Sequence, residues 1–195
     1  KFFEGMLIAA WAVEAKDIYI YLRDEYPGIR EKIIRELNVL KKKNIIDSET
    51  VVHLRRGAGA YICGEESAMI ESIEGKRGLP RHKPPFISKV GLFGQPTLNH
   101  NIETVFWVRD IIENGARWYS DQGTNNRLGP HSYSVSGRVK NPGVKLAPAG
   151  ITMNQLLNDY CGGMQEGHKF YGYLPGGASG GLLPSSMADI PLDFG

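Results

Sequence analysis

The sequence has 195 residues, which is room for one large domain or two small ones. Its 42% apolar and 23% charged residues are ordinary for a globular protein, and a net charge of +2 gives no general attraction for nucleic acid. Two cysteines, Cys63 and Cys161, are too few for a disulfide framework or for an iron–sulfur cluster. No apolar run approaches the length of a membrane span. We therefore expect a reducing, cytoplasmic location, with no direct membrane insertion and no nucleic-acid partner.

The first part of the chain predicts alternating helices and strands. Residues 2–15 suit a buried helix, and residues 17–22 (DIYIYL) are typical of a strand. A helix from Pro27 to about Leu40 and a strand over residues 50–55 follow. This order favours a mainly parallel sheet with crossover helices. The chain starts at Lys1 inside an apolar helical pattern, so we expect a piece of a longer protein.

A glycine-rich turn opens the central stretch, residues 57–104. A dinucleotide fingerprint needs G-x-G-x-x-G between a strand and a helix. Gly57 and Gly59 fit, but Ile62 holds the third position and glycine returns only at Gly64. The fingerprint is not met. A close approach of the backbone to a flat ligand and a plain tight turn both remain open.

Two adjacent carboxylates, Glu65 and Glu66, begin the next predicted helix, which ends at Gly75. A helix N-terminus attracts phosphate, but carboxylates already placed there would repel it. They would accept hydrogen bonds from hydroxyl or amide groups, such as those of ribose, ribityl or nicotinamide. Ordinary capping of the first turn is the commoner use of such glutamates.

The phosphate of a nucleotide ligand would then have to bind elsewhere, and the sequence offers two candidate phosphate-binding places. The helix predicted over residues 102–114 starts after His100 and Asn101, has no carboxylate before Glu103, and carries Thr104 one turn in. A structural histidine and an asparagine cap would explain this start equally well. The other place is the loop of residues 75–86, whose basic side chains stand beside Phe86: Lys76, Arg77, Arg81, His82 and Lys83. Together these features favour a nucleotide site.

The sequence contains no convincing nucleophile–base pair. Ser67 follows a helix start rather than standing in a G-x-S-x-G elbow, and the carboxylates beside Cys63 oppose thiolate formation. The histidines lack metal-ligand spacing. The loop PGGASGG, residues 175–181, lacks the Lys-Ser/Thr of a phosphate-binding P-loop. We predict no catalytic side chain and no metal site within this chain.

The last third changes pattern after a stretch with linker composition, residues 121–129 (DQGTNNRLG). Thr152 is expected to cap a helix that runs to about Tyr160. The strands are expected over residues 132–139, 144–147 and 169–174, with a turn at 141–143. Such a hairpin, helix and further strand predict a compact β-grasp-like unit. The final PLDFG lacks a closing strand, so we expect this end to be truncated as well.

Two motifs carry a family resemblance, GAGAYICGEESAMIESIEGKRGLPRHKPPF and GLFGQPTLNHNIET. They closely resemble the flavoprotein subunit of NADH dehydrogenases, a family that includes the complex I flavoprotein, the diaphorase subunit of NAD-reducing hydrogenases and the β subunit of NAD-dependent formate dehydrogenases. The resemblance continues from SYSVSGRVKNPGV into a β-grasp (SLBB) domain. It implies an α/β fold, with part of a Rossmann-like FMN-binding domain over residues 1–125 and an SLBB domain over residues 130–195.

The resemblance also implies cofactors and the residues that hold them. The family binds FMN and NAD(H), transfers a hydride between them, and relays electrons to iron–sulfur subunits. Its 4Fe–4S cluster ligands would lie outside this chain. The chain itself is then expected to be inactive alone. The cofactor-binding residues carried over by motif are Tyr61, Gly64, Glu65 and Glu66 at the flavin and nicotinamide, Lys83 and Phe86 at the nicotinamide nucleotide, and His100, Asn101 and Thr104 at the FMN phosphate.

The branch of the family and its role stay open between alternatives. The complex I pattern has two asparagines where this chain has His100-Asn101, and KNPGVKLAPAGIT, NDYCGGM and YLPGGASGG look like the formate dehydrogenase branch. A complex I or hydrogenase diaphorase subunit is the alternative. The second functional hypothesis is a non-catalytic docking module, in which residues 133–139 and 169–173 form the sheet that contacts neighbouring subunits. The family's upstream glycine-rich loop is expected before Lys1.

Overall fold

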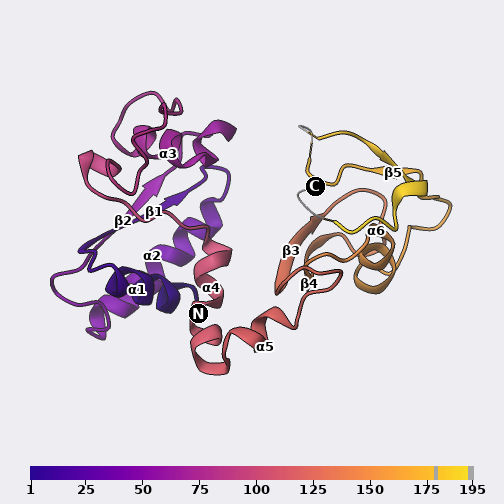
Figure 1. Ribbon diagram of the computed structural model, residues 1–195, viewed down its shortest axis with the longest axis horizontal. Helices are drawn as coiled ribbons and strands as arrows, with labels where there is room; N and C mark the ends of the chain where they lie inside the picture. The colour runs from indigo at the N-terminus through magenta and orange to yellow at the C-terminus, as the bar shows by residue number, and fades with distance from the viewer. Residues whose placement is uncertain (178–179, 193–195) are drawn as a thin grey trace. The chain divides into compact units, whose positions relative to one another are not determined.

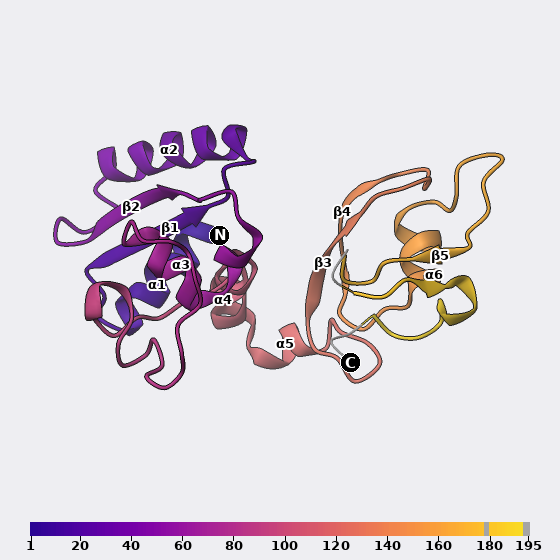
Figure 2. The ribbon, with the colours of Figure 1, turned by 90° about the horizontal axis from the view of Figure 1, so that it is seen from above.

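The chain forms two compact units, Lys1–Trp107 and Val108–Gly195, in a computed structural model that describes residues 1–177 and 180–192. Figure 1 and Figure 2 trace both units along the chain. Parts of the predicted PGGASGG loop and of the final PLDFG lie outside the described residues. Within the described part, no helix is both long enough and apolar enough to cross a membrane.

The first unit alternates helices and strands, as the sequence predicted. Its elements are α1 (Phe2–Ala12), β1 (Asp17–Leu22), α2 (Pro27–Lys42), β2 (Val51–Arg56), the 3-10 turn η1 (Tyr61–Gly64), α3 (Glu66–Ile73), the 3-10 turn η2 (Leu92–Gly94) and α4 (Ile102–Asn114). The helix α4 begins in this unit and continues past its boundary.

A parallel pair of strands forms the centre of the first unit. β1 and β2 pair in register from Asp17 opposite Val51 to Leu22 opposite Arg56. This confirms the predicted parallel sheet. Since side chains alternate along a strand, Ile20 and Leu22 point to one face and Tyr21 to the other. Both ribbon views place α2 and α3 on opposite sides of the pair (Figures 1 and 2).

The main core of this unit lies on the face of Ile20 and Leu22. Met6 of α1, Ile33 and Leu37 of α2, Ile46 and Val52 complete the buried cluster. On α2, the predicted apolar face is wider than the buried one, because Ile29 and Ile34 remain 45% and 37% exposed. A two-stranded sheet is too narrow to cover the whole apolar face of this helix.

Two expectations for α1 are wrong. Only Gly5 and Met6 are buried, and Trp11 is 81% exposed, so this is not a buried helix. The helix also ends at Ala12 rather than at Ala15, since Glu14 adopts a φ of 55°, in the left-handed region that breaks a right-handed helix.

The second unit is built from short elements around its own core. They are α5 (Ala116–Ser120), β3 (Pro130–Val135), β4 (Gly143–Pro148), α6 (Met153–Gln155), a π-helical turn η3 (Leu156–Tyr160), β5 (Gly172–Tyr173), β6 (Leu183–Pro184) and the 3-10 turn η4 (Ser185–Met187). The buried cluster contains Val135, Val139, Ala147, Ile151, Leu156, Leu157 and Cys161.

The predicted hairpin and helix cap are present in this unit, but the first strand of the hairpin is Pro130–Val135 rather than the predicted residues 132–139. β3 and β4 pair antiparallel, from Pro130 opposite Pro148 to Val135 opposite Gly143. Thr152 caps α6 through a capping box with Gln155, in which each side chain bonds the other residue's backbone N–H. The helix continues as a π-helical turn to Tyr160, where the sequence predicted its end.

The further strand differs from the expectation in length and partner. It is confined to Gly172–Tyr173 and pairs with Leu183–Pro184 rather than with the hairpin. The described residues therefore form three separate two-stranded sheets. One isolated bridge, between Thr152 and Pro191, ties the last described residues to the start of α6.

Residues 121–129 are not the free linker that their composition predicted. The N–H of Thr124 donates to the carbonyl of Ala149 at 2.9 Å, and the N–H of Ala149 donates to the carbonyl of Gly129 at 2.9 Å. The side chain of Asn125 donates to the carbonyl of Gly150 at 2.9 Å. Polar, glycine-rich residues satisfy these backbone groups, so this segment packs as part of the second unit.

Candidate functional site

The glycine turn is fixed to the end of the parallel strands. The N–H of Gly57 donates to the carbonyl of Leu22 at 2.6 Å, and the N–H of Ala58 donates to the hydroxyl of Tyr21 at 2.9 Å. A Cβ on Gly57 would lie 3.0 Å from that Leu22 carbonyl. Gly59 has a φ of +68°, and a Cβ there would meet nothing within 4 Å. The turn thus needs glycine and leaves open space above its backbone.

Glu65 caps the helix that follows this turn. Its Oε2 accepts hydrogen bonds from the backbone N–H groups of Ser67 and Ala68, both at 2.9 Å, and from the hydroxyl of Ser67 at 2.5 Å. The first turn of α3 is therefore filled by a carboxylate, as the sequence predicted. The N–H groups of Ser67 and Ala68 are thus already bonded to a negative charge, which weakens the usual attraction of a helix start for phosphate.

The hydrogen bonds keep Glu65 ionised. Burial raises the pKa of Glu65, but the Ser67 hydroxyl, the Ala68 N–H and the Lys83 ammonium outweigh it and lower the pKa to about 2. Glu65 is thus a fixed negative charge at neutral pH, with acceptor capacity for a neutral donor.

Lys83 joins the two carboxylates across the loop. Its Nζ lies 2.5 Å from Oε1 of Glu66 and 3.2 Å from Oε1 of Glu65. Hydrogen bonds to Glu66 first and to Glu65 second raise the pKa of Lys83, so the ammonium stays charged. The side chains of Lys83, Glu66 and Glu65 are about one-third exposed, at 34%, 35% and 32%. Charged groups with this much exposure can meet a ligand from solvent.

Exposed aromatic residues and open glycine backbone lie close to Glu65, Glu66 and Lys83 along the sequence. Tyr61, in η1, is 85% exposed, and Phe86, three residues after Lys83, is 55% exposed. A Cβ on Gly64 would meet nothing within 4 Å. We name Glu65, Glu66 and Lys83 the carboxylate–lysine cluster. The other predicted site residues of this stretch are Tyr61, Gly64 and Phe86.

The other three predicted site residues lie at the start of α4. The helix begins at Ile102, directly after Asn101, whose carbonyl accepts the N–H of Val105 at 3.3 Å. His100, Asn101 and Thr104 are exposed. This helix start is therefore accessible to a ligand from solvent.

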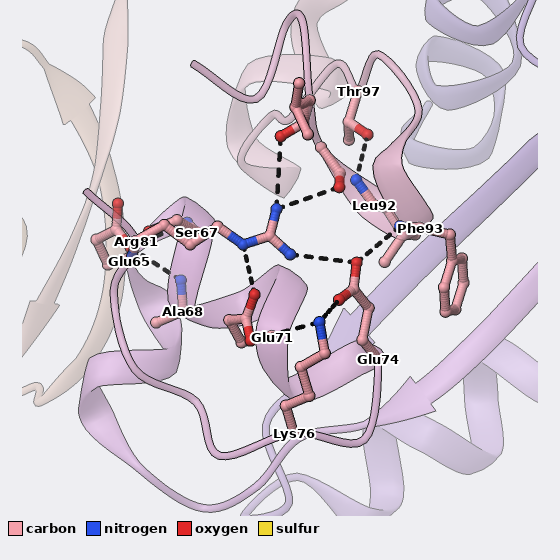
Figure 3. A network of polar contacts seen from close by, with 12 residues as sticks. Glu65, Ser67, Ala68, Glu71, Glu74, Lys76, Arg81, Leu92, Phe93 and Thr97 are labelled. Carbon is pink, nitrogen blue, oxygen red and sulfur yellow. Dashed lines mark hydrogen bonds and ion pairs between the residues drawn. The ribbon is translucent and has the colours of Figure 1, made fainter. Parts of the chain in front are cut away.

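The basic loop between the two places is held by an ion-pair network that the sequence did not predict. Arg81 Nε lies 2.5 Å from Glu71 Oε1, and its Nη2 lies 3.2 Å from Glu74 Oε1. Arg81 Nη1 also donates to the backbone carbonyls of Val90 and Gly91, at 3.4 and 3.2 Å. Figure 3 shows the guanidinium surrounded by these acceptors.

The same network takes up a second cation of the loop. Lys76 lies 2.7 Å from Glu74 and 3.9 Å from Glu71. Glu74 also accepts the N–H of Phe93 at 2.7 Å. Burial raises the pKa of Glu74, but its bonds to Lys76, to the Phe93 N–H and to Arg81 outweigh burial and lower that pKa. Lys76 and Arg81 are thus neutralised within the chain. These two cations of the loop are therefore less available to an external anion.

A signal for this network was present in the sequence. Glu71 and Glu74 are three residues apart on one helix, so their side chains share a face. That face needs a cation, and the loop that follows carries several. The spacing does not predict which basic residue pairs with Glu71 and Glu74, because that depends on the path of a loop without regular structure.

A hollow of the first unit lies away from Glu65, Glu66 and Lys83. It measures about 680 Å³ and lies by the C-terminal half of α3, where Glu71, Glu74, Lys76 and Arg81 line it. These charged groups are engaged with one another, so the hollow offers few free polar atoms to a ligand. The partly exposed cluster of Glu65, Glu66 and Lys83 is therefore the better candidate for a ligand site.

The described residues contain no group of three or more His, Cys, Asp or Glu side chains arranged to hold a metal ion. Cys63 and Cys161 are both reduced and buried, 3% and 0% exposed. Ser67, which the sequence did not favour as a nucleophile, is 1% exposed and bonded to Glu65.

Comparison with known proteins adds a family to this geometry. The family described as the Nuo51 FMN-binding domain matches residues 1–110. The chain is 44% identical, over 200 residues, to the F subunit of NADH-quinone oxidoreductase from Escherichia coli K12, and 39% identical, over 202 residues, to the F subunit from Rickettsia felis. These two alignments cover 98% and 100% of this chain, but 44% and 48% of the relatives.

A solved structure has the same fold over nearly the whole chain. It is the NAD+-reducing [NiFe]-hydrogenase in the H2-reduced state, with a TM-score of 0.85 and 36% identity, covering 99% of this chain and 33% of that one. The chain thus spans less than half the length of the curated relatives it matches, and a third of the matching hydrogenase chain.

Proposed function

Since the chain belongs to the family of Nuo51 FMN-binding domains, we propose that it is part of an NADH-oxidising flavoprotein subunit in which FMN and NAD(H) meet at the carboxylate–lysine cluster. The predicted resemblance to the flavoprotein subunits of NADH dehydrogenases is confirmed by this membership. The whole protein's reaction would be hydride transfer between NAD and FMN, with electrons passed on to iron–sulfur centres.

One observation carries the proposal: Lys83 bridges Glu65 and Glu66 at an exposed helix start, at 3.2 and 2.5 Å. A helix start filled by carboxylates disfavours phosphate and suits hydroxyl or amide donors. Ribityl and nicotinamide groups present such donors. The charge pattern therefore favours the sugar and ring portions of the ligands over their phosphates.

The local backbone fits a flat ligand. The Cβ positions of Gly59 and Gly64 are open, and Tyr61 and Phe86 are 85% and 55% exposed. Tyr61, Gly64, Glu65 and Glu66 would line the flavin and nicotinamide site, while Lys83 and Phe86 would face the nicotinamide nucleotide. Bound FMN supplies the change from two-electron to one-electron chemistry. The chain's own residues bind and orient, and none of them acts as an acid or base.

The phosphate of FMN would lie at the start of α4. His100, Asn101 and Thr104 are exposed there, and the positive end of a helix of 13 residues favours an anion. Two cations of the preceding loop that could have competed, Lys76 and Arg81, are engaged with Glu71 and Glu74. The start of α3 carries carboxylates that disfavour phosphate, whereas the start of α4 is exposed and favours an anion. This difference supports placing the FMN phosphate at α4.

Charge reversal tests the proposal in the full-length subunit. Glu66→Lys removes the bridge and places two cations side by side, so oxidation of NADH with an artificial acceptor should fall by at least about tenfold. Glu31→Lys, on the exposed surface of α2, is the matched control and should leave the rate unchanged. Unchanged kinetics in Glu66→Lys, with FMN still bound, would contradict the proposed site.

The branch of the family is a further part of the proposal. The motifs around His100-Asn101 and after residue 139 favour an NAD-dependent formate dehydrogenase, whereas the relatives that match the chain include a quinone oxidoreductase and a hydrogenase. A 4Fe–4S cluster outside this chain and iron–sulfur partner subunits belong to the same proposal, as does a cytoplasmic location. Assaying the purified parent complex with formate, hydrogen and quinone as redox partners of NAD separates the branches.

For the second unit we propose an SLBB β-grasp domain that docks the subunit to its neighbours. The outer face of its hairpin supports a contact role, because Val144 and Leu146 are 70% and 53% exposed on β4. If docking were the only role of the protein, the full-length subunit would bind no flavin. Stoichiometric FMN in the purified subunit supports the enzyme, and its absence supports the docking module.

A further inference from the structure

Ser67 has an unusual environment for a residue beside an exposed site. It is 1% exposed, and its hydroxyl stands between two polar groups from different segments. Ser67 Oγ lies 2.5 Å from Oε2 of Glu65 and 2.8 Å from the backbone nitrogen of Arg81. Figure 3 shows this serine where the basic loop passes the start of α3.

The donors fix the direction of both hydrogen bonds. The backbone N–H of Arg81 can only donate, so Ser67 accepts there, and its own proton is left for Glu65. The result is a chain from the Arg81 N–H to the Ser67 hydroxyl to the Glu65 carboxylate. A residue 14 positions along the sequence is thereby coupled to the carboxylate of the helix cap.

This chain of bonds decides which oxygen of Glu65 faces the site. Oε2 receives three donors, the N–H and hydroxyl of Ser67 and the N–H of Ala68. It has no remaining capacity for a ligand in that direction. Oε1 is left to meet Lys83 at 3.2 Å. The Ser67 hydroxyl therefore orients the carboxylate as well as capping the helix.

The other end of the chain of bonds is anchored on the same helix. The Arg81 side chain holds Glu71, in the C-terminal half of α3, and Glu74, the C-cap of that helix, at 2.5 and 3.2 Å. Its backbone N–H holds Ser67 on the first turn. One residue thus fastens the loop to both halves of the same helix, two positions before Lys83. The loop cannot move relative to α3 without breaking charged hydrogen bonds at low exposure.

We propose that Ser67 and Arg81 are positioning residues for the NADH site, acting through the Glu65 carboxylate and Lys83. This inference rests on the proposed function. Ser67 sets the orientation of the carboxylate, and Arg81 sets the register of the loop that brings Lys83 across it. Neither side chain touches the ligand, so their effect is on the geometry that the ligand meets.

A purely structural role for Ser67 makes a different prediction. Capping of α3 needs only the two N–H bonds to Glu65, which would survive removal of the hydroxyl. A structural serine would change stability and leave the Michaelis constant and the pH profile untouched. A positioning serine changes both, because Glu65 loses a donor that holds it ionised and oriented.

The experiment uses the full-length, FMN-loaded subunit with an artificial electron acceptor. We expect Ser67→Ala to raise KM for NADH by about tenfold, the effect of losing one hydrogen bond to a charged group, with a smaller change in kcat. The acid limb of kcat/KM should move to higher pH. The charged groups facing Glu65 are Lys83 and, beyond it, Glu66.

Two further variants keep the result interpretable. Ser67→Thr retains the hydroxyl and should restore KM and the pH profile, whereas Ser67→Cys fills the site with a weak donor and replaces Ser67→Ala if that variant does not fold. Ser72→Ala is the matched control: Ser72 is on the same helix and bonds Tyr21 at 3.0 Å, outside this chain of bonds.

The outcomes separate this inference from the proposed function. If Glu66→Lys impairs NADH oxidation but Ser67→Ala and Ser67→Cys keep KM and the pH profile of the parent, the positioning role is overturned and the site stands. If Glu66→Lys is itself without effect while FMN stays bound, the proposed site fails. If Ser72→Ala shifts KM as much as Ser67→Ala, the effect belongs to the helix as a whole and the inference is overturned.

Discussion

The hydroxyl of Tyr21 lies 3.0 Å from Oγ of Ser72 and accepts the backbone N–H of Ala58 at 2.9 Å. This contact joins the first strand, the helix of the carboxylate–lysine cluster and the glycine turn at one atom. The contact is therefore expected to stabilise the packing of the first unit. A phenylalanine in this place would fill the same volume without these bonds.

Tyr21→Phe should therefore destabilise the first unit by about 1–2 kcal/mol, because the Ala58 N–H and the Ser72 hydroxyl lose a shared partner. The measurement is urea unfolding followed by circular dichroism. Tyr171→Phe is the control, since Tyr171 is 77% exposed and its substitution should stay within about 0.5 kcal/mol of the parent. Equal stability of the two variants would show that the hydroxyl of Tyr21 holds nothing in place.

Stability should also depend on the ionisation of Glu65. Its pKa is lowered from 4.5 to about 2 in the folded chain. A carboxyl whose folded pKa is depressed stabilises above its unfolded pKa and loses that contribution as the pH falls through the folded value. The full shift is discounted because the side chain is 32% exposed, which leaves about 2 kcal/mol present above pH 4.5 and gone near pH 2.

The comparison of the parent with Glu65→Gln isolates this contribution. The difference in unfolding free energy between them should be about 2 kcal/mol at about pH 6 and should shrink to nothing near pH 2. Glu31→Gln, an exposed change on α2, should follow the parent across the whole range. A constant difference for Glu65→Gln at all pH values would mean that its charge contributes nothing and only its shape matters.

Regular elements with a clear period were predictable from the sequence. The strand over residues 17–22 and the helix over residues 102–114 have the predicted bounds, because β-branched and aromatic residues in the first and an apolar periodicity in the second decide the backbone locally. Short strands were harder. The third strand of the second unit depends on its partner, and that partner, Leu183–Pro184, carries almost no strand signal of its own.

At the site, the chemistry of the helix start was predictable and the contacts of the loop were not. The two glutamates at the start of a helix indicated the capping role of Glu65 directly. Nothing local indicates that Ser67 would bond Arg81 or that Arg81 would turn to Glu71, because these pairs are 14 and 10 residues apart and are joined by an irregular loop. Such contacts follow from tertiary packing rather than from propensity.

Gly78 is a place where the loop and the helix approach too closely for a side chain. A Cβ there would lie 2.5 Å from Sγ of Cys63 and 3.3 Å from the carbonyl of Ala68. Gly78→Ala should cost about 1–3 kcal/mol through overpacking, measured by thermal unfolding. Gly28→Ala is the matched control: nothing lies within 4 Å of its Cβ, so it should be neutral or stabilising by up to about 1 kcal/mol.

If Gly78→Ala proved as stable as Gly28→Ala, the loop would have to yield without loss, and the tight contact with Cys63 would carry no energetic weight. An intermediate outcome is informative as well. A stable Gly78→Ala variant whose KM for NADH rises would show that the loop moved and took Lys83 with it, since Lys83 follows five positions later.

The thiol of Cys161 should be inert while the second unit is folded. It is fully buried in the core with Leu156 and Leu157. Burial raises the pKa of Cys161, and Lys145 offsets only part of that rise, so little thiolate forms at neutral pH. We expect its reaction with a maleimide to be at least about a hundredfold slower than in denaturant, because the thiol is reached only when the core opens.

Mass spectrometry of labelled peptides gives the rate at this one residue, and Val144→Cys, at a position 70% exposed on β4, provides the fast-reacting control in the same unit. Rapid labelling of Cys161 under native conditions would mean that this core opens readily, and the second unit would then be a poor candidate for a rigid docking domain.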